Sequence, residues 1–121
     1  MQKTLLVKMK NEIKLTLAAE DFSKCYGILI LENGEYIIDI DQSKIPSDFL
    51  NRLKVWYQDY YPYTGMSLKE LESYRTHTEK LDKIGIELLN EIYKNGILSD
   101  YEINRFVYFS RGIDKILLKL N

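Results

Sequence analysis

Asp39 and Asp41 are the residues best spaced to do chemistry, because two positions along a strand put both carboxylates on one face. Such a pair could hold a divalent cation whose remaining ligands are water. Asp39, Asp41 and Ser43 also match the start of a calcium loop. The match then fails, because Lys44 and Leu50 fill the positions that need glycine and glutamate. A strand exit whose acids face water explains the pattern better, so we predict no metal and no cofactor.

Cys25 and His77 are the only thiol and the only imidazole of the chain. A nucleophilic pair would require them to meet in the fold beside a third, orienting group. Cys25 stands at the entrance to a predicted strand and His77 in a polar segment between predicted helices, so we predict structural roles for both. A zinc site would need more such ligands. Glycine-rich phosphate loops and the Gly-x-Ser-x-Gly elbow are also missing from the sequence, so we predict that the protein is not an enzyme.

Residues 55–65 hold the only tryptophan and four of the ten tyrosines. Aromatic side chains with polar tips suit a surface that is half buried and half presented to a partner. Trp56, Tyr57 and Tyr60 share the helical face of Leu53. We therefore predict that these three rings pack into the core.

The end of this aromatic segment is a better candidate for contact with a partner. Tyr61 and Tyr63 fall beyond the apolar face, and Asp59 lies on the polar face. Five acids stand against one base, Lys44, between positions 32 and 48. A local acidic segment suits the steering of a basic partner, although a solvated hairpin turn also explains it. The predicted partner-binding residues are Asp39, Asp41, Asp59, Tyr61 and Tyr63.

The composition predicts a single globular domain. Of the 121 residues, 45% are hydrophobic and 29% charged, close to globular averages. A net charge of -1 argues against nucleic acid as a direct partner. No apolar run approaches the roughly 20 residues that cross a bilayer, and the run after Lys3 is too short for a signal-peptide core. A single cysteine carries no signature of an oxidising compartment, so we expect a cytoplasmic protein without a membrane partner.

Alternating apolar residues in the first half of the chain predict strands. Residues 5–9 and 13–17 alternate on both sides of a polar break, which predicts an N-terminal hairpin. Asn33 and Gly34 then join two β-branched runs, and this dipeptide favours a type I′ hairpin turn. Residues 28–31 are apolar throughout, which predicts a central strand covered on both faces.

The second half predicts helices. After Pro46 and the candidate cap Ser47, apolar residues recur at helical spacing until Pro62 ends the helix near Tyr61. Residues 67–70 form a capping-box pattern that opens a shorter helix.

A longer helix follows and ends at Asn95-Gly96, a typical helix cap. Gly85 inside this helix costs about 1 kcal/mol relative to alanine. We therefore predict that the sheet approaches the helix closely at this glycine. The residues expected on its core-facing side are Leu81, Ile84, Gly85, Leu88 and Ile92.

Residues 103–109 return to strand-like composition, and residues 113–120 fit a short helix, with an extra strand as the alternative. The chain is thus predicted to form one α+β domain over residues 1–121. Its antiparallel sheet would have about four to five strands, packed against two or three helices. Those strands would come from the N-terminal hairpin, the Asn33-Gly34 hairpin and the segment near 103–109.

The order of motifs over residues 26–109 also points to a known group of proteins. A hairpin around Asn33-Gly34 leads into a helix containing Leu53 and Trp56, then into a helix containing Gly85 and Leu88, and then into a strand at 106–108. This order resembles a widespread group of small bacterial α/β proteins, often found as immunity proteins of contact-dependent or other polymorphic toxin systems.

The resemblance implies a non-enzymatic protein that neutralises a cognate protein toxin by occluding its active site. The toxin could be a basic nuclease domain. That group has no catalytic residues to transfer, and the matched positions look structural. Two alternatives stay open: a self-associating structural or regulatory module whose aromatic face closes a homodimer, and a small metal-dependent or nucleotide-processing enzyme using Asp39 and Asp41.

Overall fold

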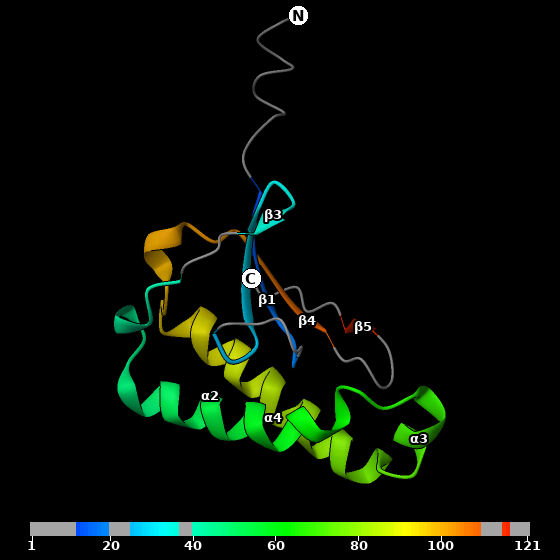
Figure 1. Cartoon of the computed structure of the whole chain (residues 1–121). Coiled ribbons are helices and arrows are strands. Elements are labelled where there is room, and N and C mark those ends of the chain that lie inside the picture. Colours follow the sequence, from blue (N-terminus) through cyan, green and yellow to red (C-terminus); the bar gives the residue numbers. More distant parts are fainter. Residues whose placement is uncertain (1–11, 20–24, 37–39, 110–114, 117–121) are drawn as a thin grey trace, which may run out of the picture.

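The computed structural model centres on a mixed sheet (Figure 1). It describes residues 12–19, 25–36, 40–109 and 115–116. The three strands of five residues are β1 (Ile13–Leu17), β2 (Ile28–Glu32) and β4 (Arg105–Phe109). The two-residue strands β3 (Glu35–Tyr36) and β5 (Lys115–Ile116) extend its edges, in the order β3-β2-β1-β4-β5.

The sheet corrects the predicted topology. β1 pairs antiparallel with β2 but parallel with β4, with Leu15 opposite both Ile30 and Phe106. The predicted antiparallel sheet of about four to five strands was therefore wrong in its pairing, because the sheet is mixed and only three of its described strands are longer than two residues. β1 has a neighbour on each side, and its predicted hairpin partner, residues 5–9, lies outside the described residues. Residues 115–116 belong to a strand and not to the short helix favoured by the sequence.

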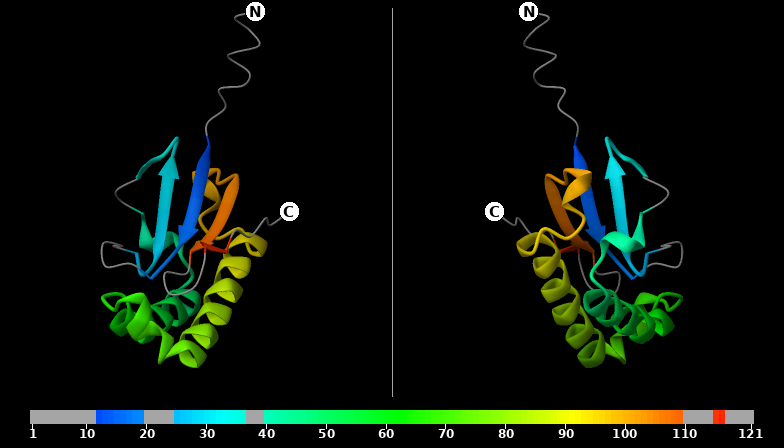
Figure 2. Two further views of the ribbon diagram at one scale, coloured as in Figure 1. Left: turned by 90° about the vertical axis from the view of Figure 1, so that its right-hand side faces the viewer. Right: turned by 90° about the vertical axis from the view of Figure 1, so that its left-hand side faces the viewer.

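Three α-helices lie between β3 and β4 in the chain: α2 (Ser47–Tyr60), α3 (Leu68–Glu72) and α4 (Arg75–Lys94). They are accompanied by the 3-10 turns η1 (Gln42–Lys44), η2 (Tyr61–Tyr63) and η3 (Ser99–Tyr101). The views of Figure 2 show α2 and α4 on the same side of the sheet. α4 packs against β4, and α2 packs against α4.

Two of the predicted local motifs are confirmed and one predicted helix cap is wrong. Ser67 and Glu70 form the predicted capping box at the start of α3. Asn33 and Gly34 have the positive φ values, 52° and 86°, that the predicted turn requires. The cap of α2 is instead Pro46, without any side-chain hydrogen bond, so the prediction for Ser47 was wrong.

The core lies between the sheet and the helix pair. Only one face of β2 enters it, because Ile28 and Ile30 are fully buried while Leu29 and Leu31 are half-buried. The predicted burial of both faces was therefore wrong. The helices contribute Phe49, Leu53, Trp56, Tyr60, Leu81, Leu88, Leu89 and Ile92 to this core.

Gly85 of α4 confirms the predicted close approach of the sheet. The ring of Tyr108, on β4, lies so near that an added Cβ at Gly85 would be 2.4 Å from its Cε1 atom. Ile84, by contrast, is 44% exposed, so its predicted place on the core face was wrong. No helix of the described part of the chain is both long and apolar enough to cross a lipid bilayer.

One buried carboxylate belongs to the same region of the core. Asp82 is 5% exposed, and its Oδ1 accepts hydrogen bonds from the hydroxyls of Tyr60, at 2.9 Å, and Tyr108, at 2.6 Å. The three residues come from α4, α2 and β4, so this network joins both helices to the sheet. No local sequence pattern predicts this role for Asp82.

Candidate partner-binding groove

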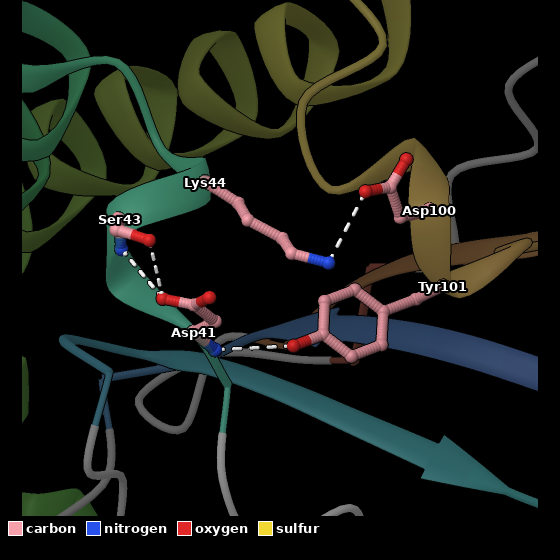
Figure 3. Close-up of polar contacts among 5 residues, drawn as sticks. All are labelled: Asp41, Ser43, Lys44, Asp100 and Tyr101. Atoms are coloured by element: carbon pink, nitrogen blue, oxygen red, sulfur yellow. Dashed lines mark hydrogen bonds and ion pairs between the residues drawn. The ribbon is translucent and has the colours of Figure 1, made fainter.

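Asp41 has a structural role at the turn before α2 (Figure 3). Its carboxylate accepts from the amide of Ser43 at 3.0 Å and from the Ser43 hydroxyl at 2.6 Å. These two hydrogen bonds lower the pKa of Asp41. The backbone amide of Asp41 donates to the hydroxyl of Tyr101 at 3.0 Å, and Lys44 pairs with Asp100 at 3.1 Å. Asp41 therefore caps η1 and helps to fasten it to η3.

The predicted pair of carboxylates cannot be assembled from these contacts, because Asp39 lies outside the described residues. Within those residues, no three His, Cys, Asp or Glu side chains converge as a metal site would require. The cap geometry of Asp41 accounts for its orientation without a cation.

Cys25 and His77 lie in different surroundings. Cys25 is 3% exposed in the core cluster, and burial raises the pKa of its thiol to about 11. His77 is exposed within the first turn of α4, so its predicted place between helices was wrong. Its Nδ1 is 2.5 Å from the hydroxyl of Tyr63. The thiol is a packed apolar group, and the imidazole is a surface hydrogen-bonding partner.

We expect the thiol of Cys25 to resist alkylation in the native protein. Burial keeps it protonated at pH 8, and only the thiolate reacts. Labelling with a thiol reagent should therefore be slower than in the unfolded chain by at least about a hundredfold. Equal labelling rates in buffer and in denaturant would contradict this burial, and an exposed cysteine in a short peptide provides the reference rate.

The two tyrosines predicted to be exposed differ from each other. Tyr61 is 52% exposed, and its ring lies beside that of Tyr57, with ring centroids 6.1 Å apart. Tyr63 is half-buried and forms a hydrogen bond with His77. Its ring packs against that of Tyr74, with ring centroids 5.4 Å apart. Tyr61 is thus the freer of the two to meet a partner.

Of the predicted contact residues that the structure describes, Asp41 lies apart from the other three. Asp41 precedes α2, whereas Asp59 lies in its last turn and Tyr61 and Tyr63 follow it. Fourteen helical residues span about 21 Å, and Figure 1 shows α2 running from the η1 side of the molecule toward α3. The helix therefore separates the acidic turn from the aromatic end.

Asp59 instead lines a groove between α2 and α4 with a volume of about 450 Å³. Core residues form its floor, namely Trp56, Leu81 and Leu88. Val55 and Ile84 also line it and are 57% and 44% exposed. Large apolar side chains this exposed are most informative where they gather in a concave site.

The polar lining of the groove is mainly acidic. Arg52 and Glu91 form a bidentate ion pair, in which Nη1 of Arg52 lies 2.8 Å from Oε2 of Glu91. That pair raises the pKa of Arg52 and lowers the pKa of Glu91, so both are charged at neutral pH. Asp59 and Glu87 are exposed, and neither forms an ion pair with a described residue. Among the described residues that line the groove, Asp59 and Glu87 are thus the carboxylates without an ion-pair partner.

Asp59 is the one groove residue that the sequence predicts to bind a partner. Val55 was detectable as an apolar residue on the polar face of α2, and Ile84 as an apolar residue one step from Gly85. Their meeting across two helices depends on how α2 packs on α4, which periodicity does not specify.

The comparisons with known proteins add no relative. No family model, curated protein or solved structure matches this chain.

Proposed function

We propose that this chain is a non-enzymatic binding protein of the bacterial cytoplasm that neutralises a cognate protein toxin by covering its active site. The observation that carries the proposal is the groove between α2 and α4, where exposed Val55 and Ile84 stand beside the unbalanced carboxylates of Asp59 and Glu87. An apolar centre with a polar rim is the usual anatomy of a protein interface.

The acidic rim favours a basic partner. Proteins that act on nucleic acid present basic surfaces to phosphates, and acidic groups placed opposite such a surface speed association and fix orientation. The basic surface of a nuclease toxin would therefore complement the negative charge of the groove rim. The order of motifs that resembles toxin-immunity proteins supports the same function.

Co-expression with the products of neighbouring genes tests the proposal. We expect one neighbour to arrest growth alone, to be harmless beside this protein, and to co-purify with it at micromolar affinity or tighter, the range of specific complexes. An unrelated toxin of similar charge is the control for non-specific rescue. The proposal fails if no neighbour is toxic, or if a toxic neighbour neither binds nor is neutralised.

A homodimer remains the second candidate, favoured by the exposure of Tyr61 (52%) and Tyr74 (46%). Light scattering distinguishes self-association from toxin binding, because it measures the mass of the protein alone in solution. A stable dimer that Tyr61→Ala dissociates, with no toxin bound, would replace the toxin-binding proposal by self-association.

A further inference from the structure

The groove is long enough to hold a third helix. α2 and α4 run antiparallel along it, because Arg52 meets Glu91 at one end and the indole Nε1 of Trp56 donates to the carbonyl of Leu81 nearer the other. The lining extends from residue 51 to 59 on α2 and from 81 to 91 on α4. At the helical rise these spans are about 12 and 15 Å. That length matches two to three turns of a third helix.

The floor of the groove is held in place before any partner arrives. Trp56 is 2% exposed, and its indole is fixed by the 2.8 Å hydrogen bond to the Leu81 carbonyl. The bidentate pair of Arg52 and Glu91 holds the two helices together at one end. A rigid floor loses little conformational freedom on binding, which favours affinity.

The charge of the lining selects the kind of helix. The charge of Arg52 is neutralised by Glu91, which leaves the carboxylates of Asp59 and Glu87 on opposite helices. Lysine or arginine side chains beside the apolar stripe of a bound helix would meet these carboxylates. An acidic helix would be repelled.

We propose that the groove between α2 and α4 binds an amphipathic α-helix of the partner protein. The apolar residues of that helix, at positions i, i+3 or i+4, and i+7, would lie over Val55, Trp56 and Ile84. Its basic residues would face Asp59 and Glu87. This inference rests on the proposed function, because it names the part of the toxin that is held. Recognition of a helix by an apolar groove is a recurrent mode of protein binding.

A synthetic peptide tests the groove without knowledge of the toxin. The probe is a helix of about 15 residues, built from leucine at the stated spacing with lysine elsewhere and without aromatic residues. Trp56 is the only tryptophan of the protein and forms part of the groove floor, so its emission reports occupancy. We expect a saturable change in that emission, and an affinity at least about tenfold weaker when glutamate replaces every lysine of the peptide.

Three variants of the full chain sharpen the test. Val55→Asp should weaken binding of the lysine peptide by at least about tenfold, because it puts a charge in the apolar contact. Glu87→Lys should weaken the lysine peptide and strengthen the glutamate peptide. Leu68→Asp is the matched control, because Leu68 is 67% exposed on α3 and does not line the groove; it should bind as the natural chain does. Circular dichroism verifies that each variant is folded.

The inference is overturned if the lysine and glutamate peptides bind equally, or if Val55→Asp behaves like Leu68→Asp. A dimer dissolved by Val55→Asp would assign the groove to a second copy of the chain and also overturn it. Failure of the proposed function is distinguishable. Peptide binding without any neutralised toxin refutes the function alone, whereas a toxin captured equally well by Val55→Asp refutes the groove alone.

Discussion

Replacing Gly85 with alanine should lower the free energy of unfolding by about 2 kcal/mol, the range expected for overpacking a core. The direction is opposite to the usual effect, because Gly→Ala within a helix ordinarily stabilises by about 1 kcal/mol. Here the new Cβ would lie 2.4 Å from Cε1 and 2.7 Å from the hydroxyl oxygen of Tyr108. Tyr108 is 1% exposed and is held by Asp82, so its ring has little freedom to withdraw.

Urea unfolding of Gly85→Ala measures this effect, and the chain supplies its own control at Gly65. A Cβ added to Gly65 meets no atom within 4 Å, so Gly65→Ala should change stability by no more than about 0.5 kcal/mol. If Gly85→Ala proved as stable as the natural chain, the close packing of α4 on β4 would be wrong.

Local signals in the sequence predicted the helices and one turn. The apolar face of Leu53, Trp56 and Tyr60 predicted α2, because helical periodicity and burial agree there. The Ser67 capping box and the Asn33-Gly34 turn were readable because each depends on a few adjacent residues. In all these cases the cause of the structure lies within one segment of the chain.

The sheet topology was missed because its cause is not local. An alternating pattern tells which residues of β1 face the core, but it does not tell which strand lies alongside. β4 pairs with β1 in parallel, and a parallel neighbour needs a crossover connection. The helices between residues 47 and 94 provide that connection, and their position between the two strands was the one signal available.

The candidate site was only partly predictable for the same reason. Asp59 was chosen because it lies near tyrosines on the polar face of α2, but its neighbours in the groove come from α4. Ile84 was assigned to the core because it is adjacent to Gly85. One helical position is about 100° of rotation, which is enough to move Ile84 from the core to the groove lining.

The burial of Asp82 was not predicted, because an acidic residue in an amphipathic helix normally lies on the face exposed to water. Asp82 nevertheless shares a helix face with Gly85 and Leu89, at spacings of three and seven, and both of those residues are buried. Burial, together with the nearby charge of Asp82, raises the pKa of Tyr108. Its hydroxyl therefore stays protonated at neutral pH and remains a donor to the Asp82 carboxylate.

Replacing Asp82 with alanine should lower the free energy of unfolding by about 3 kcal/mol, since each hydrogen bond to a charged group contributes about 1.5–3 kcal/mol. The variant removes the acceptor that the hydroxyls of Tyr60 and Tyr108 share. It also deletes the contact that ties α4 to both α2 and β4. Asp82→Asn keeps the size and one acceptor oxygen, so its loss should be smaller. Urea unfolding monitored by circular dichroism gives both values.

A cycle of variants separates the network from simple loss of packing. If the tyrosine hydroxyls act through Asp82, Tyr108→Phe should cost clearly less in the Asp82→Ala background than in the natural chain, by about 1 kcal/mol or more. The exposed acid Glu79, which forms an ion pair with Arg75 on the surface of α4, serves as the matched control. Glu79→Ala should change stability by less than about 1 kcal/mol. Additive costs for Asp82 and Tyr108, or equal costs for Asp82→Ala and Glu79→Ala, would show that the carboxylate does not join the helices to the sheet.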